Sequence, residues 1–169
     1  MTVQPPIAIQ NEAPSDAAAV DALVERAFGP GRYAKAAERL REGNVLRGDL
    51  SFVAMAGELV VGAIRQWPVA VGEAQGVFLG PIAVNPDYRS HGLGAQLIGR
   101  AVEAAEAASE AFILLVGDAP LFAPHGFEVV PAGMVRMPGP VDPRRVFWRA
   151  CRPGGLDEVA GQAHVPRDA

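Results

Sequence analysis

Two glycines at the expected start of a long helix belong to the most informative group of residues in this chain. They lie in the run Arg89-Ser90-His91-Gly92-Leu93-Gly94. The first N–H groups of a helix have no acceptor within it and lie at the positive end of its dipole. Gly92 and Gly94 carry no side chain, so an anion can approach these groups closely, and Arg89 and His91 could add charge. The run is a candidate pyrophosphate-binding loop, although its glycines could instead simply permit a tight strand-to-helix turn.

Two common phosphate-binding motifs do not match this run. No Gly-Lys-Ser/Thr follows the glycines, so no lysine is placed for a terminal phosphate. The dinucleotide fingerprint needs three glycines in an early strand–helix unit, and this run has only two of them. We therefore expect a phosphate-bearing ligand of another class.

A second unusual feature is Gly80-Pro81, which lies inside the apolar run 76–84. Proline cannot donate a hydrogen bond to a sheet, so this pair predicts a bulge. The apolar run 112–116 follows a long helix and is expected to be the parallel neighbour of 76–84. The bulge would part the two strands at their carboxyl ends, beside the glycine-rich helix start. Parted strands expose backbone groups that pair with an amide-bearing ligand such as pantetheine, and CoA carries both pantetheine and a pyrophosphate.

The hydrophobic pattern predicts one α+β domain over residues 1–151, followed by a flexible tail, 152–169, that is rich in Gly, Pro and polar residues. Ser15 is the expected N-cap of the first helix. The expected strands are 7–10, 51–56, 59–67, 76–84, 112–116, 127–130 and 145–151. The expected helices begin near 15, 33, 93 and 120 and end near 27, 41, 108 and 125.

Several segments of the chain resemble the GCN5-related N-acetyltransferase (GNAT) family. Arg89-Ser90-His91-Gly92-Leu93-Gly94 is similar to the family's Arg/Gln-x-x-Gly-x-Gly motif. Four further segments resemble a small bacterial subgroup of that family, namely 27–33, 79–84, 115–127 and 137–143. The likeness thus covers roughly residues 7–151. The resemblance implies a GNAT fold, which is a mixed, strongly twisted sheet of about six to seven strands with flanking helices, splayed between its fourth and fifth strands.

The resemblance also implies acetyl-CoA as cosubstrate, and no metal. Pantetheine would pair with the backbone of Ile82, Ala83 and Val84. The pyrophosphate would meet the loop and helix start, formed by Arg89, Ser90, His91, Gly92, Leu93, Gly94 and Ala95. An acceptor amine would attack the thioester directly, with a backbone N–H of the bulged strand polarising its carbonyl.

The chain departs from the family at the position that often holds a tyrosine near the CoA sulfur. That position is Phe122, which has no hydroxyl and cannot protonate the departing thiolate. His125 is the nearest titratable replacement, or an exposed histidine at a helix end. Asp118 is a candidate base, or the cap of the helix that begins near Pro120. A catalytically weak acyl-CoA-binding or regulatory module therefore remains an alternative to an enzyme, as does a structural or interaction protein that keeps the fold without the cofactor.

The acceptor is expected to enter opposite CoA, with Arg32, Tyr33, Arg65 and Trp67 as candidate wall residues. No acidic cluster marks a polyamine or aminoglycoside site, and the sequence does not identify the acceptor.

Composition narrows the class of protein. The formal net charge of −4 argues against a nucleic-acid partner, and no apolar run is long enough to span a membrane. The N-terminus does not resemble a signal peptide, and the single cysteine cannot form an internal disulfide. We therefore expect a cytoplasmic protein, with a homodimer as a possible assembly.

Overall fold

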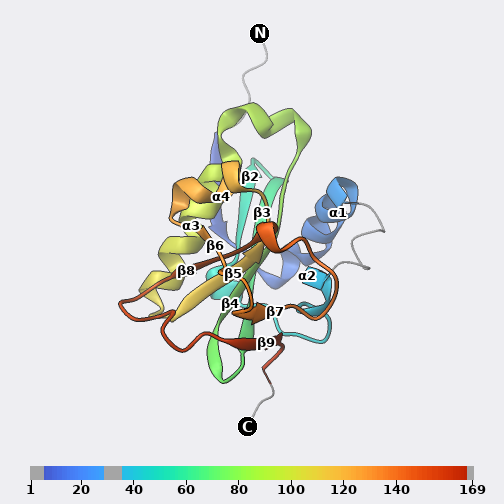
Figure 1. Cartoon of the computed structure of the whole chain (residues 1–169). Coiled ribbons are helices and arrows are strands. Elements are labelled where there is room, and N and C mark those ends of the chain that lie inside the picture. The colour runs from blue at the N-terminus through green and yellow to red at the C-terminus, as the bar shows by residue number, and fades with distance from the viewer. Residues whose placement is uncertain (1–5, 29–35, 167–169) are drawn as a thin grey trace.

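The fold is a mixed, twisted sheet with helices on both faces (Figure 1). The computed structural model describes residues 6–28 and 36–166, apart from the side chains of Ser90 and His91. Seven strands form the main path in the order β1-β2-β3-β4-β5-β8-β6. They are β1 (Ile7–Asn11), β2 (Phe52–Ala56), β3 (Leu59–Val71), β4 (Ala74–Val84), β5 (Phe112–Val116), β8 (Val146–Ala150) and β6 (Glu128–Val129). Within this path only β4 and β5 are parallel, as the sequence predicts for strands joined by a helical crossover.

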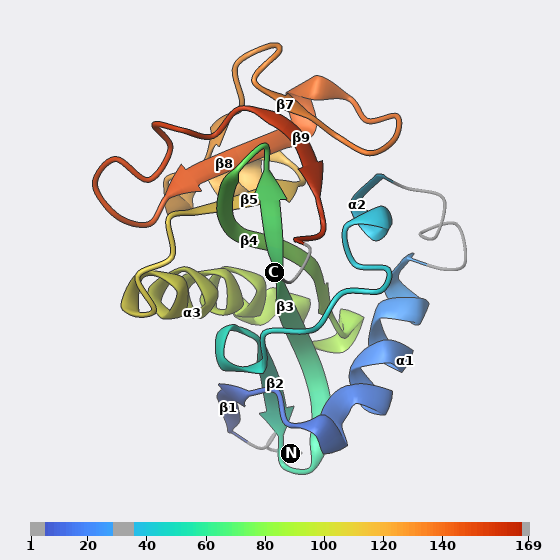
Figure 2. The ribbon, with the colours of Figure 1, turned by 90° about the horizontal axis from the view of Figure 1, so that it is seen from below.

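Two helices cover opposite faces of the sheet (Figure 2). The helix α1 (Ala17–Phe28) buries Val20, Leu23 and Val24 against one face. On the other face lies α3 (Leu93–Ala107), whose apolar stripe enters the largest core cluster. That stripe contains Leu93, Leu97, Ala101 and Ala105, the spacing that the sequence predicts for a buried helix face.

Two shorter helices lie near the carboxyl ends of β4 and β5. One is α2 (Ala36–Arg39), and the start at Tyr33 that the sequence predicts lies outside the described residues. The other is α4 (Ala119–Phe122), which continues as a 3₁₀ turn over Ala123–His125, close to the predicted 120–125.

The predicted N-cap Ser15 is wrong. Pro14 starts a 3₁₀ turn over Pro14–Asp16 that precedes α1, so Ser15 lies inside the turn. Ala13 is the cap residue, and its N–H donates to the Asp16 carboxylate at 2.9 Å. A proline fits the first position of a helical turn because it has no N–H to leave unpaired.

The C-terminal segment differs from the expected tail because it contains a strand. The strand β9 (Gly161–His164) pairs with β3 through Ala70 and Val71, and with the short β7 (Val135–Arg136). Val159 and Ala163 are buried. The Gly72 N–H donates to the Gln162 carbonyl oxygen at 3.0 Å, and the Ala160 backbone lies where a side chain at Gly72 would be. A glycine at this turn thus lets the two backbones approach closely.

A buried arginine links the sheet to α1. Arg65 on β3 donates from Nε and Nη2 to both oxygens of Glu12, each at 2.9 Å, and from Nη1 to Asp21 of α1 at 2.8 Å. The side chains of Arg65 and Glu12 are 11% and 2% exposed, whereas Asp21 is 60% exposed. Burial by itself lowers the pKa of Arg65, but the hydrogen bonds and charges of Glu12 and Asp21 raise it, so the guanidinium stays charged.

We expect Glu12→Gln to lower the free energy of unfolding by about 3 kcal/mol, because it leaves the buried Arg65 charge without its main partner. Asp21→Asn is the matched control on the same guanidinium. It removes an exposed partner and should cost less than about 1 kcal/mol. Urea unfolding of both variants measures the difference, and equal losses would show that burial does not set the strength of this network.

Candidate functional site

The strands β4 and β5 part at the place that the sequence predicts. Their parallel pairing covers Val77, Phe78 and Leu79 and does not continue beyond Leu79. On the opposite edge of β4, the register with β3 shifts between Ile64 and Gln66, where the single residue Arg65 faces both Gly80 and Pro81. This shift is a β-bulge. The strands are thus splayed at their carboxyl ends.

An indole group holds the bulge. Trp67 on β3 donates its Nε1–H to the Gly80 carbonyl oxygen at 2.7 Å. Gly80 has a φ of 139°, which L side chains rarely adopt. The carbonyl released from regular pairing therefore still has a donor.

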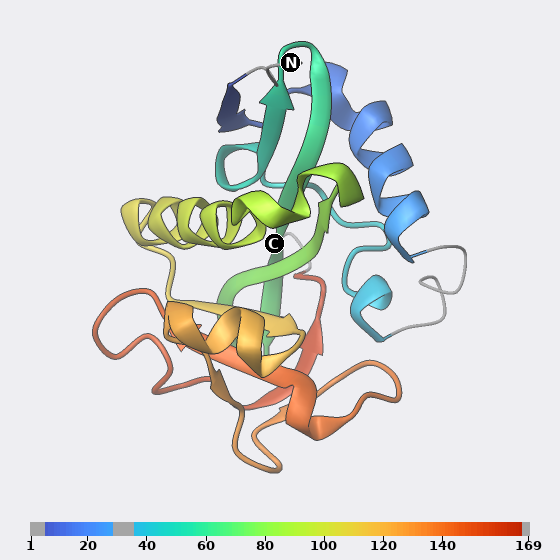
Figure 3. The ribbon, with the colours of Figure 1, turned by 90° about the horizontal axis from the view of Figure 1, so that it is seen from above.

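The helix α3 begins beside the splayed strands (Figure 3). Its N-cap is Gly92, with a φ of 67° and no side chain to cap the helix. A Cβ atom built at Gly92 meets nothing within 4 Å. Since the N–H groups of the first helical turn have no acceptor within the helix, those of Leu93, Gly94 and Ala95 are suited to bind an anion.

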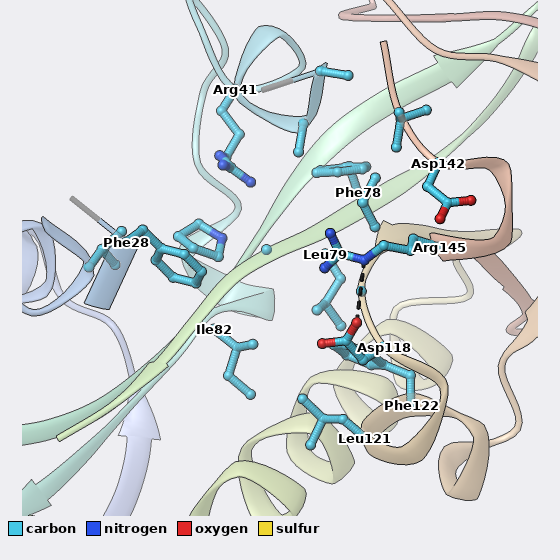
Figure 4. Close-up of a pocket in the computed structure, with 18 of the residues that line it drawn as sticks. Phe28, Arg41, Phe78, Leu79, Ile82, Asp118, Leu121, Phe122, Asp142 and Arg145 are labelled. Carbon is cyan, nitrogen blue, oxygen red and sulfur yellow. Dashed lines mark ion pairs between the residues drawn. The ribbon is translucent and has the colours of Figure 1, made fainter. Parts of the chain in front are cut away.

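A cavity of about 410 Å³ opens at the bulge (Figure 4). It lies between α1, α2, β4, the end of β5, α4 and the segment 140–145. Most of its wall is apolar: Val24, Phe28, Phe78, Leu79, Pro81, Ile82, Val116, Leu121, Phe122, Pro140 and Val141. Four charged side chains complete the wall: Arg41, Asp118, Asp142 and Arg145.

Phe122 lies at the base of the cavity and is buried. Its ring packs edge-to-face against Phe127, with centroids 5.9 Å apart and an angle of 78°. The ring also fills the space where a side chain at Gly117 would lie. The departure from the family's tyrosine thus produces an apolar, well-packed position without a proton donor.

Asp118 follows β5 and faces the cavity, as Figure 4 shows. Its main-chain oxygen accepts from the N–H groups of Leu121 and Phe122, but its side chain does not cap α4. The carboxylate instead forms an ion pair with Arg145, with Oδ1 3.3 Å from Nε. Of the two predicted catalytic candidates, Asp118 is on the cavity wall and His125 is not.

The predicted CoA-binding residues fall into three groups. Ile82 lines the cavity, whereas Ala83 is buried against α1 and Val84 is half-buried against the α3 face. Arg89 and Ala95 are exposed, and Gly94 is half-buried. Leu93 is buried in the core, so it can offer only its backbone to a ligand.

Two predicted wall residues have other contacts. Arg65 is held by Glu12 and Asp21, and Trp67 by Gly80, and neither lines the cavity. The predictions for Arg32 and Tyr33, and for the side chains of Ser90 and His91, fall outside the described part of the chain.

Sequence reasoning missed the wall residues Arg41, Asp142 and Arg145. Asp142 belongs to a segment that resembles the family, but that likeness assigns it no role. Arg41 and Arg145 carry no local signal at all.

Comparisons with known proteins agree on one class. Residues 47–129 match the family model described as "Acetyltransferase (GNAT) domain". The uncharacterized N-acetyltransferase YhbS of Escherichia coli K12 is 36% identical over 124 residues, which are 72% of this chain and 73% of that protein.

Solved structures give the same result over more of the chain. A crystal structure of E. coli YhbS in complex with CoA has a TM-score of 0.81 at 30% identity, covering 98% of this chain and 93% of that one. A GNAT-family acetyltransferase of Brucella melitensis in complex with acetyl-CoA has a TM-score of 0.63 at 28% identity. The match covers 86% of this chain and 97% of that one.

The parted strands, the open helix start and these relatives define an acetyltransferase. The chain belongs to the GNAT family of N-acetyltransferases. Its seven-strand path, splayed between β4 and β5, confirms the predicted fold.

We expect Gly117→Ala to destabilise the protein by about 1–3 kcal/mol, because the new methyl group would overlap the buried Phe122 ring. Gly117 does not have a positive φ, so the cost is steric. The control is Gly99→Ala in α3, where a Cβ meets nothing within 4 Å. It should raise stability by up to about 1 kcal/mol. Chemical unfolding compares the two, and a neutral Gly117→Ala would mean that the Phe122 ring can move aside.

Proposed function

We propose that the protein transfers an acetyl group from acetyl-CoA to the amine of a small acceptor. One observation carries this proposal: the gap between β4 and β5 at Gly80-Pro81 lies beside the open N-terminus of α3. A long thioester ligand with amides at one end and a diphosphate at the other fits this arrangement. The CoA and acetyl-CoA complexes of the two relatives support the same choice of ligand.

In this proposal the backbone does most of the binding. The pantetheine amides pair with the β5-facing edge of β4 at Ile82, Ala83 and Val84. The diphosphate meets the N–H groups of the helix start, from Ser90 to Ala95, with Arg89 nearby. A helix N-terminus favours such an anion through both its N–H groups and its dipole.

The reaction is a direct transfer. The acceptor ammonium loses one proton, and the neutral nitrogen attacks the thioester carbonyl carbon. A C–N bond forms, the nitrogen gives its second proton to water, and the C–S bond breaks with its electron pair going to sulfur. A backbone N–H of the bulged strand stabilises the oxyanion between these steps, and this donor is not Pro81, which has no N–H. The products are the acetylated amine, CoA and the proton released from the ammonium.

Asp118 is the proposed proton acceptor. It faces the cavity at the end of β5, where the acceptor nitrogen would meet the thioester. The carboxylate attracts the ammonium and passes its proton on to water. Water also protonates the thiolate, because Phe122 has no hydroxyl. The acid role of His125 stays a prediction from the sequence.

A non-catalytic acyl-CoA-binding module is a second candidate, favoured by Phe122 alone. Release of CoA thiol from acetyl-CoA with a panel of amines separates the two. Tight CoA binding with no thiol release from any amine would favour the binding module.

Location and assembly are also proposals. No helix in the described part of the chain is long and apolar enough to cross a membrane. We propose a cytoplasmic enzyme with no nucleic-acid partner, and size measurement in solution would test the possible homodimer.

We expect Gly94→Glu to weaken CoA binding by about tenfold or more, which is about 1.4 kcal/mol, because its carboxylate would repel the diphosphate. The same change should not harm the fold, because an acidic residue suits the first turn of a helix and Gly94 has no close neighbour. Gly99→Glu adds the same charge to α3 away from its start and should bind CoA as the wild type does. Calorimetry measures both affinities, and an equal loss in the two variants would contradict diphosphate binding at the helix start.

We expect Asp118→Asn to lower kcat by about 10²-fold or more while CoA binding stays unchanged, because the amide cannot accept the proton. Steady-state rates over a range of pH measure this. An unchanged kcat would assign the proton transfer to water or to another group.

A further inference from the structure

The charged side chains of the cavity differ in how firmly other residues hold them. Arg41 is 12% exposed and donates from both Nε and Nη2 to Glu38, at 3.1 and 2.8 Å. Asp142 accepts three hydrogen bonds from Arg144, which lower its pKa. These two side chains already belong to tight local pairs.

Asp118 and Arg145 are joined much more loosely. Their side chains are 73% and 49% exposed, and Oδ1 of Asp118 lies 3.3 Å from Nε of Arg145. Exposed pairs of this kind contribute little to stability, so a ligand can replace either partner at small cost. Both side chains point into the same part of the cavity (Figure 4).

The rest of the cavity limits the acceptor in size and polarity. The cavity volume of about 410 Å³ is at the small end of the range for small-molecule sites, and the acetyl end of the thioester would take part of it. The part of the wall that does not belong to the charged pair is mainly apolar, and it includes Val24, Phe28, Phe78 and Val141. Two guanidinium groups balance two carboxylates, so nothing in the described wall favours a polycation.

We propose that the acceptor is a free α-amino acid with an apolar side chain. Its ammonium would replace Arg145 at Asp118, and its carboxylate would replace Asp118 at Arg145. The ammonium nitrogen and a carboxylate oxygen of an α-amino acid are separated by only two carbon atoms, so they can contact the neighbouring side chains of Asp118 and Arg145 at the same time. The apolar side chain would extend toward Phe28 and Phe78.

This inference rests on the proposed function and uses the same transfer. The α-nitrogen, after losing its proton toward Asp118, forms the new bond to the acetyl carbon, and the sulfur leaves with the electron pair. Arg145 takes no part in the bond changes and acts as a specificity residue. An N-acyl amino acid leaves the site as a monoanion.

The test compares L-phenylalanine, L-leucine and L-methionine with their carboxamides and with phenethylamine, by release of CoA thiol. The amino acids should have a kcat/KM at least about tenfold above those of compounds that lack the carboxylate, because a charged hydrogen-bonded pair is worth about that factor or more. The inference would be overturned if the amides, phenethylamine, spermidine or a peptide were acetylated as efficiently as the amino acids.

Two arginines supply the variant and its control. Arg145→Gln should raise KM for L-phenylalanine at least about tenfold and leave KM for phenethylamine nearly unchanged. Arg136→Gln removes the same charge from an exposed side chain on β7 that does not line the cavity, so it should behave as the wild type. An equal effect of Arg145→Gln on both substrates would contradict carboxylate recognition.

A measurement of acetyl-CoA binding distinguishes a failure of this inference from a failure of the proposed function. If the protein binds acetyl-CoA and acetylates other amines in preference, the acceptor class is wrong and the function stands. If acetyl-CoA does not bind, both proposals fail. If it binds without turnover, calorimetry with the CoA-loaded protein decides, because L-phenylalanine must bind more tightly than phenethylamine.

Discussion

The break in pairing between β4 and β5 is the constraint on which the rest of the site depends. A continuous parallel pair would close the sheet where the cavity now opens. Proline at position 81 cannot donate to a neighbouring strand, and the bulge places two residues opposite Arg65. The indole of Trp67 satisfies the Gly80 carbonyl. The fold therefore accepts the loss of regular pairing without leaving that buried acceptor unpaired.

The residue opposite the bulge also positions one wall of the cavity. Arg65 reaches from β3 to Glu12 and to Asp21 of α1. The other end of α1 brings Val24 and Phe28 to the cavity. The sheet defect and the helix that faces it are thus linked through one side chain, although that side chain does not touch the cavity.

Local signals in the sequence predicted most of the elements and the place of the break, because runs such as 112–116 and the pair Gly80-Pro81 carry their own physical meaning. The strand β9 escaped prediction because it is only four residues long, buries only Ala163, and lies in a segment rich in Gly, Pro and polar residues. The expected cap Ser15 was wrong because Pro14 starts a 3₁₀ turn ahead of α1, and Ser15 lies inside that turn. The pairing of Asp118 with Arg145 could not be predicted, since nothing near either residue indicates that the other folds against it.

Leu121 gives the two halves of the site a shared boundary. It lines the cavity, and its Cδ1 lies 4.0 Å from where a side chain at Gly94 would begin, at the start of α3. One leucine thus borders both the helix start proposed for the diphosphate and the cavity proposed for the amine. Any movement of Leu121 when one substrate binds changes the room left for the other, and thermodynamic linkage makes that effect equal in both directions.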